Sequence, residues 1–311
     1  MISREMTPFR RLKNTLLSPR TVLLMNALPF VIFIFIFSYL PLVGWIMSLY
    51  DYKAGVPLSK QEFTGLYYFK IVFDPNSGFY QSLINTLALN FLGLMCSPVA
   101  LIFAVMINEL KGKRFRRIIQ TISSLPNFIS WILVYVVFFT FFGNQGFVNT
   151  ILMNIGIIKE PINVLGNDEI SWYFQTMVGL WKNVGWGAII YIASMSGIDT
   201  ELYDAAAVDG CDRFGNIWHI TIPSLLPTYI VLLLLMVSNM LGSNFEQFYV
   251  FSNPLVVNKL NVLDIFIYKR GLGMAEYSFA TALGIMRSIV SISLLLSVNW
   301  IARKIRGNSI I

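Results

Sequence analysis

Long stretches without a charged residue constrain the fold of this chain more than any other feature. Four stretches contain no Asp, Glu, Lys or Arg over 30, 34, 41 and 32 residues: 21–50, 75–108, 118–158 and 214–245. Two more, 172–198 and 277–302, each contain one cation, Lys182 and Arg287 respectively. A helix rises about 1.5 Å per residue and crosses a bilayer with about 20 apolar residues. The six stretches therefore predict six transmembrane helices.

The composition supports this prediction. Charged residues make up 13% of the chain, about half of the roughly 25% that a soluble globular protein has. A soluble enzyme, a disordered regulator and a disulfide scaffold are excluded on this basis. We expect an all-α polytopic membrane protein that forms a single permease domain over residues 1–311. The predicted helices lie near 22–47, 81–108, 118–142, 173–197, 224–247 and 278–301.

The loops between these helices predict the orientation of the chain. Segments 1–21, 109–117, 198–223 and 302–311 would lie on one side, and they contain 14 Lys and Arg residues in 66. The opposite loops, near 51–80, 143–172 and 248–277, contain seven in about 90. Lys and Arg are enriched in cytoplasmic loops. Both termini are therefore predicted to be cytoplasmic, and the basic cluster at 111–117 is interpreted as a topology anchor, not a nucleic-acid site.

Residues that would indicate catalysis or a bound cofactor are scarce. Cys96 and Cys211 lie far apart in the sequence and show no metal-ligand spacing, and His219 is the single histidine. No Gly-x-x-x-x-Gly-Lys-Ser/Thr loop, nucleophile elbow or paired catalytic carboxylate is present. We expect two inert thiols, no metal site, no cofactor bound by this chain and no enzymatic activity.

The predicted cytoplasmic loop 198–223 is unusual because it is acidic. It contains five acids and one cation: Asp199, Glu201, Asp204, Asp209, Asp212 and Arg213. Asp199 or Thr200 can cap a short helix, the alanines that follow favour it, and Gly210 can end it. Such a helix suits insertion into a groove on another protein. The alternative is an amphipathic segment that lies on the lipid surface.

The motif in this loop resembles the EAA loop of permease subunits in type I, binding-protein-dependent ABC importers. It runs Asp204-Ala205-Ala206, two residues, Asp209-Gly210, nine residues, then Ile220-Thr221-Ile222-Pro223. Asp204 stands where the family usually has Glu, and Ile222 where it has Leu. Further matches to the carbohydrate-importer branch are Arg116-Arg117, Leu125-Pro126, Ile129-Ser130-Trp131, Gly146-x-x-Asn149, Trp181-Lys182-x-x-Gly185, Phe245-Glu246-Gln247-Phe248 and Asn253-Pro254.

The resemblance implies a set of partners and a location in a bacterial-type cytoplasmic membrane. They are a second permease subunit, expected to be a related but different chain, a cytoplasmic ABC ATPase dimer that uses ATP and Mg, and an extracytoplasmic binding protein that delivers a carbohydrate. It also implies that Asp204, Ala205, Ala206, Asp209, Gly210, Ile220 and Pro223 couple the permease to the ATPase. A non-sugar solute, an ion-gradient-driven secondary transporter and a membrane scaffold without transport remain as alternatives.

Polar residues within the predicted helices are candidates for the substrate pathway. Lys182 and Arg287 could face a common aqueous cavity and meet an acid such as Glu246. Alternatively, Lys182 shortens the fourth span and Arg287 packs between subunits. Amides and aromatic rings near the fourth and fifth spans could bind a sugar, or could serve only in packing and interface belts: Asn183, Trp186, Tyr191, Asn239, Asn244 and Gln247.

Overall fold

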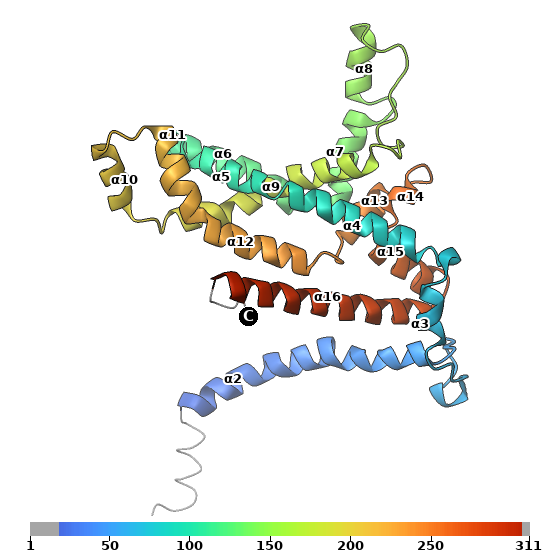
Figure 1. The fold of residues 1–311 in the computed structure, drawn as a ribbon. Coiled ribbons are helices and arrows are strands. Elements are labelled where there is room, and N and C mark those ends of the chain that lie inside the picture. Colours follow the sequence, from blue (N-terminus) through green and yellow to red (C-terminus); the bar gives the residue numbers. More distant parts are fainter. Residues whose placement is uncertain (1–18, 307–311) are drawn as a thin grey trace, which may run out of the picture.

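The computed structural model describes the backbone of residues 19–306 and the side chains of residues 21–300. Within this range the regular secondary structure consists of helices and one isolated β-bridge, between Tyr50 and Phe63, with turns and loops between the helices (Figure 1). The α-helices, in chain order, are α2 (Pro19–Ile34), α3 (Tyr67–Val72), α4 (Phe79–Met95), α5 (Pro98–Asn108), α6 (Lys113–Ser124), α7 (Trp131–Phe142), α8 (Phe147–Asn154), α9 (Ser171–Met195), α10 (Thr200–Val208), α11 (Arg213–Asn216), α12 (Ile222–Ser238), α13 (Phe245–Phe251), α14 (Val257–Leu260), α15 (Leu263–Tyr268) and α16 (Tyr277–Arg306). Most of the expected cytoplasmic segment 1–21 lies outside the described residues.

Five helical stretches of the described chain are long and apolar enough to cross a membrane. They are Thr21–Leu49, Phe79–Asn108, Trp131–Asn154, Arg213–Ser238 and Tyr277–Trp300. Helix α9 is also long, with 25 residues, but it is less apolar. The all-helical membrane architecture predicted from the sequence is therefore confirmed at this level.

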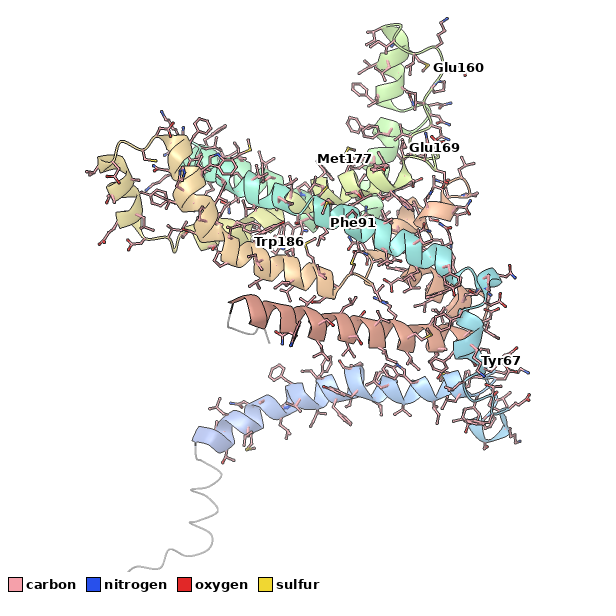
Figure 2. The ribbon with its side chains drawn as sticks, viewed as in Figure 1. Tyr67, Phe91, Glu160, Glu169, Met177 and Trp186 are labelled. Carbon is pink, nitrogen blue, oxygen red and sulfur yellow. The ribbon has the colours of Figure 1, made fainter. Side chains whose placement is uncertain are left out.

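Large apolar side chains cover the outer faces of the helices. Every side chain from residue 22 to residue 43 is exposed, and the helix that carries them meets the rest of the chain mainly where η2 (Leu40–Leu49) packs on α16. Phe91 and Met177, on α4 and α9, are 51% and 47% exposed (Figure 2). Apolar patches of this extent are typical of surfaces that contact lipid or another subunit.

The prediction of one continuous helix over 118–142 is wrong. Helix α6 ends at Ser124, the 3-10 turn η5 (Leu125–Phe128) follows, and Ile129 is extended with φ −86° and ψ 147°. Pro126 causes the break because proline has no N–H group and its ring displaces the preceding turn. Helix α7 starts again after Ser130, whose side chain accepts a hydrogen bond from the N–H of Leu133.

The predicted fifth helix, 224–247, is displaced toward the N-terminus. It begins at Arg213 in α11, continues through the π-helical η6 (Ile217–Thr221) and α12, and ends at Ser238. Pro223 is the second residue of α12 and follows the π-helical turn η6 inside this continuous helix. The helix stops where Asn239, Gly242 and Asn244 follow, because glycine and asparagine have low helix propensity.

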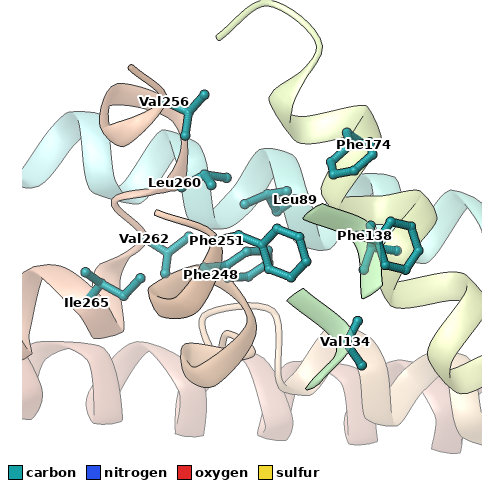
Figure 3. Packing of buried hydrophobic residues seen from close by; sticks show 11 residues of the cluster. Leu89, Val134, Phe138, Phe174, Phe248, Phe251, Val256, Leu260, Val262 and Ile265 are labelled. Atoms are coloured by element: carbon teal, nitrogen blue, oxygen red, sulfur yellow. The ribbon is translucent and has the colours of Figure 1, made fainter. Parts of the chain in front are cut away.

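The segment expected to be the extracytoplasmic loop 248–277 is part of the core instead. Helices α13, α14 and α15 pack against α4, α7 and α9. The buried apolar cluster formed there consists of Leu89, Val134, Phe138, Phe174, Val178, Phe248, Phe251, Val256, Leu260, Val262 and Ile265 (Figure 3). Because the segment consists of short helices with turns between them, its sequence has no apolar run long enough to distinguish it from a loop.

Candidate functional site

The acidic loop forms the short helix that its sequence predicts. Asp199 caps α10, and its side chain accepts a hydrogen bond of 3.0 Å from the N–H of Glu201. Gly210 follows the helix with φ +76°. The N–H of Gly210 donates to the carbonyl of Ala207 and the N–H of Cys211 to that of Ala206. This pair of bonds is a Schellman motif, which requires the left-handed conformation that glycine adopts without strain.

Helix α10 projects away from the helical body (Figure 1). Asp204, Ala205 and Asp209 are exposed and Ala206 is half-buried. Exposed apolar side chains surround the helix: Leu202 is 50% exposed, Val208 88%, Phe214 72% and Trp218 66%. The helix therefore presents a small-residue surface with acidic and apolar side chains around it, and no other part of the described chain covers this surface.

Two contacts attach the loop to the helical body. The Tyr203 and Thr221 hydroxyls lie 2.9 Å apart and share a hydrogen bond. The Arg213 guanidinium donates to the Glu109 carboxylate and to the Glu109 backbone carbonyl at the end of α5. Tyr203 therefore links α10 to the π-helical turn before α12, and Arg213 links the start of that continuous helix to the end of α5.

A cavity of about 560 Å³ lies between α4, α9, α12 and the start of α13. Along α9 it extends from Gln175 to Tyr191, 16 residues apart, which corresponds to about 24 Å of helix. Ten of its lining residues carry an amide or a hydroxyl: Asn90, Ser97, Gln175, Thr176, Asn183, Tyr191, Tyr229, Asn239, Asn244 and Gln247. The remaining lining residues are apolar or small.

Hydrogen bonds fix several of these polar side chains in place. The Gln247 amide donates to the carbonyl and the side-chain oxygen of Gln175, at 2.8 and 3.0 Å. The Ser97 and Tyr229 hydroxyls lie 2.9 Å apart. Asn244 is exposed, and within the described chain its side chain makes no hydrogen bond. Its amide is therefore available to a ligand in the cavity.

The candidate pathway residues fall into two groups. Five of them line this cavity: Asn183, Tyr191, Asn239, Asn244 and Gln247. Trp186 does not; it is 48% exposed and packs edge-on against Phe128, with ring centroids 5.5 Å apart. Lys182 and Arg287 do not line it either, so the two cations do not meet in one cavity.

Lys182 binds the broken third helix. Its ammonium group donates three hydrogen bonds, of 2.9, 2.9 and 2.7 Å, to the backbone carbonyls of Pro126, Asn127 and Ile129. These carbonyls lie where the helix is interrupted and lack helical partners. The residue is 5% exposed, and its charge is compensated by three backbone dipoles.

Gly185, one turn further along α9, permits the close approach that this contact requires. A Cβ at Gly185 would lie 2.1 Å from the carbonyl oxygen of Ser123 in α6. The Trp181-Lys182-x-x-Gly185 motif therefore has a structural basis. Lys182 donates hydrogen bonds to the carbonyls at the break in the third helix, and Gly185 lets α9 pack closely against α6.

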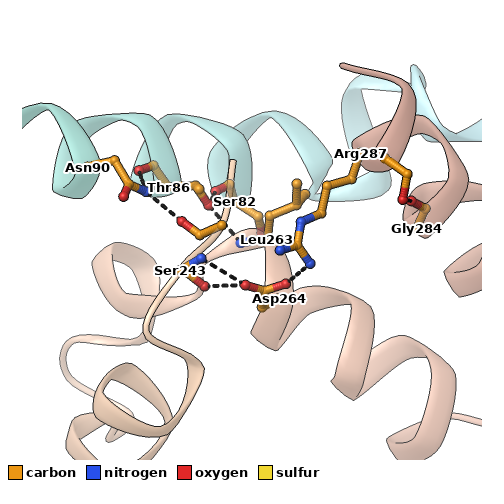
Figure 4. A network of polar contacts seen from close by, with 10 residues as sticks. Ser82, Thr86, Asn90, Ser243, Leu263, Asp264, Gly284 and Arg287 are labelled. Carbon is orange, nitrogen blue, oxygen red and sulfur yellow. Dashed lines mark hydrogen bonds and ion pairs between the residues drawn. The ribbon is translucent and has the colours of Figure 1, made fainter. Parts of the chain in front are cut away.

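Arg287 forms an ion pair with Asp264, an acid outside the predicted spans (Figure 4). The Asp264 carboxylate also accepts hydrogen bonds from the N–H and the hydroxyl of Ser243, at 3.0 and 2.6 Å. From the other side, the Asn90 amide donates to the carbonyl of Gly242 at 2.9 Å. The turn between α12 and α13 is therefore held by polar contacts on both sides, and Asn239 and Asn244 at its ends face the cavity.

Sequence reasoning missed several residues that belong to the site. Asn90 and Ser97 are polar residues inside the charge-free run 75–108, and such interruptions could have identified them. Gln175 and Thr176 lie in the predicted fourth span, in which only Lys182, Asn183, Trp186 and Tyr191 were singled out as candidates. Asp264 could not have been found, because the region around it was interpreted as a loop.

Known proteins with similar sequences are components of membrane transport systems. The family model for the inner membrane component of binding-protein-dependent transport systems matches residues 96–307. Protein LplB of Bacillus subtilis (strain 168) is 36% identical over 279 residues, which cover 89% of this chain and 87% of LplB. The polygalacturonan/rhamnogalacturonan transport system permease protein YteP of the same organism is 31% identical over 297 residues, which cover 95% of this chain and 91% of YteP.

A solved structure has the same fold. It is the crystal structure of a bacterial alginate ABC transporter in complex with alginate pentasaccharide-bound periplasmic protein. One of its chains matches with a TM-score of 0.83 and 32% identity, covering 93% of this chain and 96% of that chain. The chain therefore belongs to the family of inner membrane components of binding-protein-dependent transport systems.

Proposed function

We propose that this chain is the permease subunit of an ATP-driven importer that moves a sugar or oligosaccharide across the cytoplasmic membrane. The observation that carries the proposal is α10, a capped, acidic, alanine-containing helix that projects from a membrane-embedded body. The names of the relatives support a saccharide, since they include permeases for polygalacturonan/rhamnogalacturonan and for arabinooligosaccharides. The cavity lined with amides and hydroxyls supports it independently.

The proposed topology has six crossings, with α9 as the crossing between α7 and α12. Packing of α9 against α4, α5, α6 and α12 supports this assignment. Both termini are proposed to be cytoplasmic. In Figure 1 the two ends of the described chain lie on the side of the molecule toward which α10 projects, and the excess of Lys and Arg in the loops of that side agrees.

The proposed assembly contains a second permease subunit, a cytoplasmic ATPase dimer and an extracytoplasmic binding protein. A periplasmic protein is present in the alginate transporter structure that this chain resembles. The ATPase would bind ATP and Mg, and this permease would bind neither, because its sequence contains no phosphate-binding loop. The exposed surface around α10 is the site at which we place the ATPase.

The geometry suggests how ATP-driven motion reaches the cavity. Residues 213–238 form one continuous helix, which begins beside α10 and lines the cavity with Tyr229, Leu232 and Met236. When the ATPases close, the two α10 helices of the permease pair would approach each other. Each would move its α12 as a rigid body, and the cavity would open to the other side of the membrane.

Substitution of Ala205 tests this function. Ala205→Arg places a long cation on the exposed small-residue surface of α10. We expect the variant to remain in the membrane but to lose the ATPase when the assembly is co-purified in mild detergent, because the side chain would not fit a groove shaped for alanine. Uptake into vesicles should fall with it.

Ala54→Arg is the matched control, because Ala54 is an exposed alanine in the loop on the opposite side. It should retain the ATPase. Retention of both ATPase binding and transport by Ala205→Arg would contradict the assignment of α10.

A further inference from the structure

The 560 Å³ cavity contains no charged residue. No Asp, Glu, Lys, Arg or His is among the residues that line it, and its polar groups are the six amides and four hydroxyls named above. Amides and hydroxyls both donate and accept hydrogen bonds, as saccharide hydroxyls do. The lining is therefore complementary to an uncharged polyol along about 24 Å of α9.

Behind the turn that lines this cavity, Arg287 is paired with Asp264. Two further charged residues line an adjoining cavity of about 270 Å³, which shares Asn183 and Asn244 with the larger one. It is lined by Lys182 and Glu246. The three ammonium protons of Lys182 are all donated to backbone carbonyls, so this cation has no donor left for a ligand. Glu246 is exposed and forms no hydrogen bond or close ion pair within the described part of the chain, and Lys182 is the cation on which its charge acts across this cavity.

Binding of a sugar carboxylate in this cavity would be unfavourable in free energy. Removing an anion from water without a paired cation is unfavourable, as it is for a buried unpaired charge. Glu246 would add repulsion at the end where Asn244 offers its free amide. A neutral saccharide meets neither cost.

We infer that this subunit selects uncharged saccharides and disfavours uronic acid polymers, with Glu246 as the group that repels anions. The inference rests on the proposed function and narrows its substrate class.

Charged thiol reagents test the electrostatics directly in the assembled transporter. Asn244→Cys is introduced after Cys96→Ser and Cys211→Ser, and its reaction rates with cationic trimethylammonioethyl and anionic sulfonatoethyl methanethiosulfonate are compared with those of a free thiol. We expect the cationic reagent to be favoured, and Glu246→Lys to reverse the preference several-fold. Ala54→Cys in the same background should show no change with Glu246→Lys. A preference for the anionic reagent at Asn244→Cys would overturn the inference.

Protection by saccharides tests the substrate class. Neutral malto-, xylo- and arabino-oligosaccharides and an oligogalacturonate of equal length are each added during labelling of Asn244→Cys. We expect at least one neutral sugar to slow labelling and the oligogalacturonate to leave it unchanged. Protection by the oligogalacturonate, or by none of the sugars, would overturn the inference. The proposed function is tested separately, by whether the Ala205→Arg variant binds the ATPase.

Discussion

At the scale of single residues, an ionisable group in an apolar helix does not by itself indicate transport. Lys182 and Arg287 are the two cations of the predicted spans, and each is bound by other parts of the same chain. Lys182 donates hydrogen bonds to three carbonyls at a helix break, and Arg287 forms an ion pair with the carboxylate of Asp264. The polar groups that face the cavity are instead neutral amides and hydroxyls, which cost less to bury than charges.

The role of Lys182 leads to a stability prediction. Lys182→Met keeps an unbranched side chain only one atom shorter but leaves the carbonyls of Pro126, Asn127 and Ile129 without the donors that Lys182 supplies. We expect the free energy of unfolding to fall by about 2–4 kcal/mol, because hydrogen bonds to charged groups contribute more than neutral ones. Thermal unfolding in detergent measures the loss. Lys60→Met, at an exposed lysine, is the control, and equal stability of the two variants would contradict the role assigned to Lys182.

At the scale of elements, close contact between α6 and α9 compensates for the interruption of the third helix. Helix α9 packs on both α6 and η5, so it supports the chain on the N-terminal side of the break. The absence of a side chain at Gly185 is what permits this distance, since the carbonyl of Ser123 occupies the space that a Cβ would need.

Substitution of this glycine should separate the two elements. We expect Gly185→Ala to destabilise the chain by about 1–3 kcal/mol, the usual cost of overpacking. Gly284→Ala in α16 is the matched control, because no atom beyond its chain neighbours and the surrounding backbone of its own helix lies within 4 Å of the position of its Cβ. That variant should be neutral or slightly stabilised, since alanine favours a helix more than glycine does. If Gly185→Ala unfolds at the same temperature as Gly284→Ala, the close contact does not exist in the protein.

At the scale of the whole molecule, the distribution of charge and the arrangement of helices indicate the same orientation. The acidic helix α10 and the two described ends lie on one side, while Ala54 belongs to the loop 51–80 on the other. Because the first helix exposes its apolar side chains from residue 22 to residue 43, it requires lipid or a second subunit around it.

Thiol labelling tests this topology. In the Cys96→Ser variant, Cys211 should react with a membrane-impermeant maleimide only after right-side-out vesicles are permeabilised. Ala54→Cys, in a background that also lacks Cys211, should react in intact vesicles. Labelling of Cys211 from outside would contradict the cytoplasmic placement of α10, and labelling of both positions from the same side would contradict the number of crossings between them.

Sequence alone determined the features that depend on local composition and spacing. Charge-free runs are long enough to require a bilayer, and Asp199, the alanines and Gly210 encode α10 through capping and propensity, which act within a few residues. Only the tertiary structure decided the features that depend on contacts between distant segments. The burial of 248–265, the carbonyls that Lys182 binds 53 to 56 residues away and the pairing of Arg287 with Asp264 are not encoded in any short window. The partner of a buried polar group is the group that folding brings within hydrogen-bond distance. The spacing of residues in a single sequence does not show which distant residue that is.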